Sequence, residues 1–328
     1  MTTRVPLALV AAVLALLGLT ACGTTEPSPG AAPAGPPAAG SPITLTDARG
    51  TTVTLPAPAR RVVALEWNVA EHAVTLGVMP VGVADVAGYQ KWASVAPLDA
   101  SVRDVGVRGE PSVDSIAALR PDLVLAADEV PAAALGQIQA FAPVVVVPGG
   151  RAGDPLGQVK ANTTLIGQAL GKDAAAAEQI RALDATIADG RARLAGQAGQ
   201  RFVFADGYVE AGQVSIRPFT DGSQIGAVTT ALGLVNAWTE PGDATYGLAQ
   251  TDVEGLTRVG DARFLYIVND GDGGDPFRTE LAGNAVWRSL PFVQTDRVDR
   301  LPDGIWVFGG PVSLQRYVGA AVGALTRT

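Results

Sequence analysis

Apolar residues between positions 61 and 147 recur in short runs, and segments with apolar residues at helical spacing separate these runs. The runs predict β-strands at Val62–Leu65, Val81–Ala84, Val102–Val105, Leu123–Ala126 and Val144–Val147. The spaced segments predict helices near Val69–Leu76, Val113–Leu119 and Ala132–Phe141. Strands and helices in alternation are typical of a parallel sheet with helices on its faces. Ahead of them, alternation over Ile43–Leu55 predicts a β-hairpin.

A different pattern follows the fifth strand. Residues 154–170 have apolar side chains at helical spacing, with Asp154 placed to cap the helix and Pro155 at its first position. An alanine-rich helix then runs to about Leu194. Beyond it the alternation resumes, with strands at Phe202–Ala205 and Arg263–Val268 and helices near Gln224–Leu232, near Val253–Val259 and from about Val312.

The second half of the chain resembles the first half. The residues from Arg61 correspond to those from Arg201, and the residues from Val113 to those from Val253, both at an offset of 140. Leu76-Gly77 corresponds to Leu232-Gly233 at a larger offset of 156. We therefore predict an α/β fold of two lobes with mostly parallel central sheets, joined by one long helix. The predicted divisions are a first lobe over 43–153, a linking helix over 154–171 and a second lobe over 172–328.

The N-terminus has the pattern of an export signal. Arg4 is the only charge before Glu26, Val5–Leu19 is apolar, and Leu-Thr-Ala-Cys ends at Cys22. This sequence resembles the lipobox of bacterial lipoproteins, which predicts a signal over residues 1–21 and a lipid on Cys22; an ordinary signal with an incidental cysteine is the alternative. Residues 22–42 are rich in Pro, Ala, Gly, Ser and Thr and are predicted to be a disordered tether. We expect the protein on the extracytoplasmic face of the bacterial cell membrane.

Composition and motifs argue against several function classes. The chain has 24 basic and 32 acidic residues, and this balance argues against nucleic-acid binding. The only histidine, His72, falls on a helix of apolar spacing, and the sequence has neither a Gly-x-Ser-x-Gly elbow nor a phosphate loop. Because Cys22 is the only cysteine, direct transition-metal binding is also poorly supplied. We therefore predict no catalytic residue, no metal ligand and no cofactor; an exported hydrolase is the less favoured alternative.

Aromatic residues and arginines are well supplied at predicted loops and strand ends. Tyrosine and tryptophan commonly contact bulky, partly apolar ligands, although ordinary packing explains each of them equally well. Arg108, beside Gly109, can extend into a cleft, where its planar fork suits paired oxygens; an ion pair with Glu110 is the alternative. The candidate ligand-binding residues are Trp67, Tyr89, Trp92, Arg108, Arg217, Tyr246, Trp306 and Phe308.

Two long stretches, VALEWNVAEHAVTLGVMPVGVADVAGYQKW and DVGVRGEPSVDSIAALRPDLVL, carry a resemblance to a known family. With LGLVNAW, VWRSLPFVQTDRVDRL and IWVFGGPVSLQRYV they resemble the ferric hydroxamate siderophore-binding proteins of ABC importers, in family order over residues 60–325. The resemblance implies two lobes bridged by a long helix, with a shallow ligand cleft between them. It also implies that the protein delivers its ligand to an ABC permease and the ATPase of that permease.

The resemblance assigns roles to residues of this chain. Arg108 is implied to grip oxygens of the iron–hydroxamate centre, while Trp92, Tyr246 and Trp306 line the pocket. Two departures are visible: Phe308 replaces an expected tyrosine, and Asp128 and Glu129 lie near the place of another. Asp114 and Glu254 match the carboxylates that meet permease arginines in related proteins, although both also suit helix N-termini.

The sequence therefore predicts a monomeric, lipid-anchored binding protein for a ferric siderophore, with hydroxamate as the favoured chelating group. The ligand would be the complete Fe(III) complex. A catecholate siderophore, haem and a corrinoid are the alternatives within the same class of binding protein.

Overall fold

The computed structural model describes residues 42–327. The predicted signal over residues 1–21, the lipidation site Cys22 and all of the predicted tether except its last residue lie outside the described residues. Within 42–327, no helix combines the length and the apolar character needed to cross a membrane.

The first lobe is built on a parallel sheet. Its strand order is β5-β4-β3-β8-β9 and every pairing in it is parallel, as predicted. The strands are β3 (Val62–Ala64), β4 (Gly82–Val83), β5 (Arg103–Asp104), β8 (Leu123–Ala127) and β9 (Val144–Val147). The helices are α1 (Trp67–Thr75), α2 (Val86–Trp92), α3 (Val113–Ala118) and α4 (Ala132–Gln139). Two antiparallel hairpins complete the lobe, β1 (Ile43–Thr46) with β2 (Thr52–Leu55) and β6 (Gly106–Val107) with β7 (Glu110–Pro111).

Alternate residues of the sheet face two separate apolar clusters. Val62 and Ala64 of β3 pack with residues of α1, whereas Val63 packs with Ile116 of α3 and Ile138 of α4. Because a strand directs successive side chains to opposite faces, a strand covered by helices on both sides must be apolar throughout. This explains why these strands read as continuous apolar runs.

The second lobe has a mixed sheet. Its path is β11-β10-β13-β14, with β12 also paired to β10, and only the β10–β11 pairing is antiparallel. The strands are β10 (Arg201–Glu210), β11 (Gln213–Pro218), β12 (Val235–Asn236), β13 (Arg263–Ile267) and β14 (Val298–Arg300). The helices are α7 (Gln224–Ala231), α8 (Ala285–Ser289), α9 (Pro291–Gln294) and α10 (Pro311–Leu325), with a 3₁₀ turn, η2 (Gly255–Arg258), where a helix was predicted near Val253–Val259.

The two lobes share one topology. In the first lobe β3 leads through α1 to β4 beside it, and β8 lies on the other side of β3. In the second lobe β10 leads through α7 to β12 beside it, and β13 lies on the other side of β10. Helices α1 and α7 both end at a glycine of positive φ, Gly77 (83°) and Gly233 (97°). Along the sequence, strand β11 is inserted between β10 and α7. This insertion accounts for the rise of the sequence offset between the two lobes from 140 to 156 residues.

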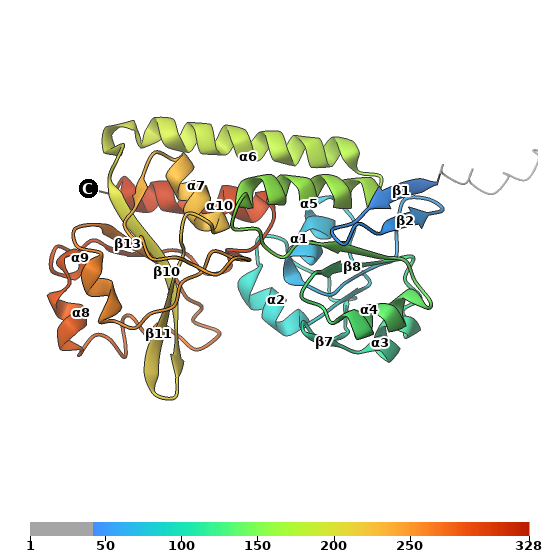
Figure 1. Ribbon diagram of the computed structural model, residues 1–328, viewed down its shortest axis with the longest axis horizontal. Coiled ribbons are helices and arrows are strands. Elements are labelled where there is room, and N and C mark those ends of the chain that lie inside the picture. The colour runs from blue at the N-terminus through green and yellow to red at the C-terminus, as the bar shows by residue number, and fades with distance from the viewer. Residues whose placement is uncertain (1–41, 328) are drawn as a thin grey trace, which may run out of the picture. The chain divides into compact units, whose positions relative to one another are not determined.

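Two helices connect the lobes. Helix α5 (Pro155–Ala169) begins as predicted, with the Asp154 side chain accepting from the Gly157 amide. It contributes Val159 to a second-lobe cluster and Ile166 to a first-lobe cluster. Helix α6 (Asp173–Arg193) runs along both lobes (Figure 1) and ends in the 3₁₀ turn η1 (Ala195–Gln197). The link predicted for residues 154–171 is thus shared with the alanine-rich helix, and the predicted domain boundaries stay a prediction.

Candidate functional site

A cavity of about 270 Å³ lies where the two lobes meet. The first lobe contributes three residues that follow strands and one residue of α1, and the second lobe contributes a strand residue, one leucine and three aromatic side chains from its loops. The lining residues are Glu66, Asn68, Arg108, Gly149, Arg217, Tyr246, Leu248, Trp306 and Phe308. Glu66 and Gly149 follow the carboxyl ends of β3 and β9, the edge at which open α/β sheets bind ligands.

Arg108 is held by a carboxylate and an aromatic ring. Its Nη1 donates to Glu66 Oε1 at 2.9 Å, and its guanidinium lies 3.9 Å from the ring centroid of Trp67. Its partner is therefore Glu66 rather than Glu110. Burial raises the pKa of Glu66, while the nearby Arg108 charge opposes that rise. Since guanidinium has five N–H donors and only Nη1 is bonded to Glu66, the others stay available to a ligand.

Arg217 forms the matching pair on the second lobe. Arg217 of β11 lies directly across from Asp206 of β10, and its Nε donates to Asp206 Oδ1 at 2.8 Å. A second bond joins Arg217 Nη2 to Asp206 Oδ2. Burial raises the pKa of Asp206, and the bonds from Arg217 lower it. Each lobe therefore presents one arginine to the cavity, and each arginine is already bonded to a carboxylate.

The aromatic side chains form a continuous series along the cavity. Ring centroids are 4.8 Å apart for Trp67 and Trp306, 5.1 Å for Trp306 and Phe308, and 5.2 Å for Phe308 and Tyr246. These edge-on contacts are a favoured aromatic geometry and hold the rings in fixed orientations. The Tyr246 hydroxyl donates across the lobes to Glu129. The site therefore offers an apolar wall with a few polar groups.

Three candidates from the sequence lie beside the cavity or away from it. Trp67 is buried, and its Nε1 lies 3.2 Å from the carbonyl oxygens of both Ala84 and Asp85. These contacts hold in place the ring on which the Arg108 guanidinium lies. Tyr89 lies in the first-lobe core, and its hydroxyl donates to the Ala96 carbonyl at 2.7 Å. Its stretch was expected to be a loop but forms α2, because the buried Tyr89 ring anchors a short helix capped by Asp85.

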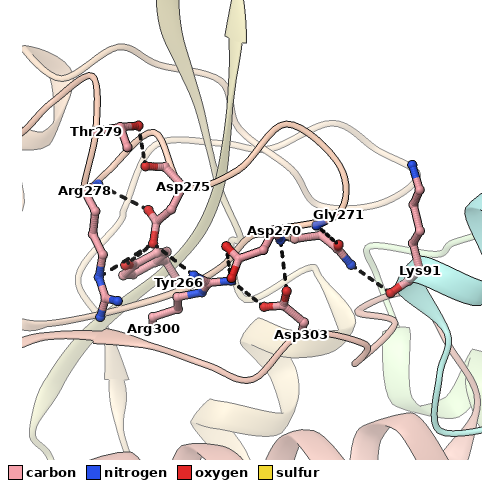
Figure 2. Close-up of polar contacts among 10 residues, drawn as sticks. Lys91, Tyr266, Asp270, Gly271, Asp275, Arg278, Thr279, Arg300 and Asp303 are labelled. Atoms are coloured by element: carbon pink, nitrogen blue, oxygen red, sulfur yellow. Dashed lines mark hydrogen bonds and ion pairs between the residues drawn. The ribbon is translucent and has the colours of Figure 1, made fainter.

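Trp92 ends α2 at the rim and contacts the second lobe. Its Nε1 donates to Asp272 Oδ2 at 2.8 Å, and its ring lies 6.3 Å from Trp306. Asn269 Nδ2 donates to the Lys91 carbonyl at 2.7 Å (Figure 2), and Lys91 Nζ is 3.4 Å from Asp272. We call these four residues the rim contact. In the sequence, the one weak signal for this contact is the acidic, glycine-rich segment Gly271–Asp275.

The loop of the rim contact is held by Arg300. Its Nη2 lies 2.8 Å from Asp270 and 2.6 Å from Asp303 (Figure 2). Arg300 belongs to β14, and its guanidinium brings positive charge to the acidic turn. Among residues 42–327 no group of three or more histidine, cysteine or carboxylate side chains is arranged to hold a metal ion.

A third contact between the lobes is fully buried. Glu71 of α1 accepts from the amides of Gly310 and Ser313 at 3.0 and 3.1 Å, and from Ser313 Oγ at 2.7 Å. We call this the buried contact. It places a carboxyl group at the N-terminus of α10, where free amides and the helix dipole favour it. Burial nevertheless raises the pKa of Glu71 to about 7.

His72 lies next to the buried contact and away from solvent. Its ring nitrogens are 2.7 Å from the Asn68 carbonyl and 3.1 Å from Thr163 Oγ1, and burial lowers its pKa. The side chain is therefore a packed, neutral group at neutral pH. Asp114, in the first turn of α3, and Glu254, which precedes η2, are both exposed on their lobes. Their role in permease docking stays a prediction.

Comparisons with known proteins agree with this architecture. A family profile described as periplasmic binding protein matches residues 62–304. The iron(3+)-hydroxamate-binding protein FhuD of Escherichia coli is 26% identical over 260 residues, covering 79% of this chain and 84% of that protein. The probable siderophore-binding lipoprotein YfiY of Bacillus subtilis is 23% identical over 325 residues, covering 93% of each. The crystal structure of FhuD from Vibrio cholerae bound to Fe3+-Desferal superposes with a TM-score of 0.72 at 28% identity, covering 81% of this chain and 97% of the other.

Proposed function

Because the chain belongs to the periplasmic binding protein family, we propose that it binds a ferric siderophore of the hydroxamate type between its lobes and delivers it to an ABC importer. The protein is a solute-binding protein and not an enzyme. Relatives named for ferric hydroxamate and for siderophore binding support the ligand class.

The observation that carries the proposal is Arg108 at the centre of an aromatic cavity between the lobes. A hydroxamate chelate presents several oxygens around its iron, and a guanidinium with unused donors suits such paired oxygens. The organic arms of the chelate would lie against Trp306, Phe308 and Tyr246. Iron would arrive as part of the ligand, because among residues 42–327 no three histidine, cysteine or carboxylate side chains are arranged to hold a metal ion.

The remaining predictions describe how the protein is used at the membrane. Lipid on Cys22 would hold it at the extracytoplasmic face, with residues 22–42 as the tether. Asp114 and Glu254, one exposed carboxylate on each lobe, would contact arginines of the permease. We propose that the protein acts in this way as a monomer.

Titration with ferric ferrioxamine and ferrichrome, followed by tryptophan fluorescence, tests the proposal. Quenching should saturate, because Trp67 and Trp306 lie at the site. Arg108→Ala should weaken binding about tenfold to hundredfold, the usual loss for hydrogen bonds from a charged donor. Arg181→Ala is the control, since Arg181 pairs with Glu178 on exposed α6. The absence of saturable quenching with any ferric hydroxamate would overturn the proposed function.

A further inference from the structure

The charges at the cavity are unusual for a site that would attract anions. Arg108 is bonded to Glu66 and Arg217 to Asp206, so both guanidinium groups are neutralised before a ligand arrives. An anionic ligand that recruited either arginine would leave a largely buried carboxylate without its partner, which is costly. A neutral chelate needs only the donors that these pairs leave unused.

A third carboxylate, that of Glu129, lies against two residues of the cavity lining, Gly149 and Tyr246. A side chain on Gly149, which lines the cavity, would overlap the carboxylate oxygens of Glu129 and the hydroxyl of Tyr246. Because Gly149 has no side chain, the Glu129 carboxylate packs directly against the backbone of the cavity lining. The negative charge of Glu129 also contributes to the raised pKa values of Glu66 and Tyr246, which line the cavity.

Glu129 differs from the other two carboxylates in its partner. Its Oε1 accepts from the neutral Tyr246 hydroxyl, and among residues 42–327 no lysine or arginine pairs with it. The neighbouring Asp128 accepts from the Gly149 amide at 2.9 Å, and its charge also contributes to the raised pKa of Tyr246. Two guanidinium groups thus lie near four carboxylates, which leaves negative charge in excess at Glu129 and Asp128. The charge lies at the exposed edge of the cavity, where a flexible arm of a ligand can extend.

We infer that the cavity selects chelates by charge, and that Glu129 binds a primary ammonium carried on an arm of the ferric complex. The inference rests on the proposed function and narrows its substrate class. A ferric hydroxamate with one ammonium would place its neutral iron centre at the two arginine pairs and its charge at Glu129. An anionic ferric catecholate would meet an excess negative charge.

The test compares two chelates that differ by one charge. Ferric ferrioxamine B carries a free ammonium, and its N-acetyl derivative has the same iron centre without that charge. The wild-type protein should bind the ammonium form about tenfold more tightly, and added salt should reduce this ratio. A ferric triscatecholate should bind more weakly than either.

Glu129→Gln separates the charge of Glu129 from its structural contact. The glutamine oxygen can still accept from Tyr246, so the contact between the lobes is kept. The tenfold ratio should fall to about one, while affinity for the acetylated chelate stays within about twofold. Glu210→Gln, at the exposed end of β10, should leave the ratio unchanged.

The outcomes distinguish the two proposals. Equal affinity of the wild-type protein for both chelates, or a ratio that survives Glu129→Gln, would overturn the role of Glu129 and leave the proposed function standing. Tightest binding of the catecholate would overturn selection by charge. If neither hydroxamate chelate bound to the wild-type protein, the proposed function would fail together with this inference.

Discussion

Two carboxylates cross between the lobes in opposite directions, and their surroundings differ. Glu71 extends from the first lobe to α10 with 0% of its surface exposed, whereas Asp272 extends from the second lobe to α2 with a side chain 51% exposed. Each accepts well-formed hydrogen bonds. Burial decides what the bonds are worth, because a buried group has no water to replace a lost partner. The buried contact is therefore expected to stabilise the arrangement of the lobes, and the rim contact to add little to that stability.

Removing the Glu71 carboxyl should have the largest effect. Glu71→Ala would leave two α10 amides and the Ser313 hydroxyl unpaired beside a new cavity, at a cost of about 4 kcal/mol in the free energy of unfolding. Urea unfolding at fixed pH measures the loss. Glu71→Gln is the matched control, since its amide oxygen can still accept from the two backbone amides and its NH2 group can donate to Ser313 Oγ. A loss below about 1 kcal/mol for Glu71→Ala would contradict the role of the buried contact.

The pH dependence of stability gives a second test of the buried contact. The pKa of Glu71 rises from 4.5 in the unfolded chain to about 7 in the folded protein. Its contribution to stability is therefore full below about pH 4.5, is lost as the pH rises to about 7, and is constant above. At about 1.4 kcal/mol per pKa unit the change is roughly 3 kcal/mol.

The difference in unfolding free energy between wild type and Glu71→Gln isolates this group from Glu66 and Asp206, whose pKa values are also raised. Between pH 5 and pH 7, the unfolding free energy of the wild type should fall relative to that of Glu71→Gln. A flat difference curve would show that burial does not set the protonation of Glu71.

The rim contact should give the smallest change in stability. Asp272→Ala removes the acceptor for Trp92 and the ion pair with Lys91, yet exposed pairs are worth about 0.5 kcal/mol. Its main effect should fall on ligand release, about threefold faster because Trp92 loses its fixed orientation beside Trp306. Stopped-flow dissociation measures this rate. Asp272→Asn keeps an acceptor for Trp92 and should release ligand at nearly the wild-type rate; equal acceleration in both variants would count against orientation as the cause.

Local pattern predicted the first lobe better than the second. Strands β3, β8 and β9 match the predicted runs to within one residue, because helices on both faces keep these strands apolar. Strands β11 and β14 were missed, since Arg217 and Arg300 interrupt their apolar character and find carboxylates across the fold. Helix α2 was missed because one buried tyrosine, rather than a repeated apolar spacing, holds it.

The candidate site was predicted in part for the same reason. Arg108, Arg217, Tyr246, Trp306 and Phe308 were identified as candidates and line the cavity. Glu71 and Asp272 were not, because their contacts join residues 242 and 180 positions apart and have no local signature. Glu129 was noted only as a departure from the family pattern. Its contacts with Gly149 and Tyr246 join residues far apart in the sequence and have no local signature.

The two helices that connect the lobes have a consequence for how the chain unfolds. Val159 of α5 packs in one core and Ile166 in the other, while α6 donates from Gln179 to Thr75 at one end and packs Gly190 against Leu232 and Val318 at the other. Unfolding of either lobe would expose an apolar face of the helices that also pack against the other lobe. Because the two lobes share these helices, they are expected to unfold together in one cooperative transition.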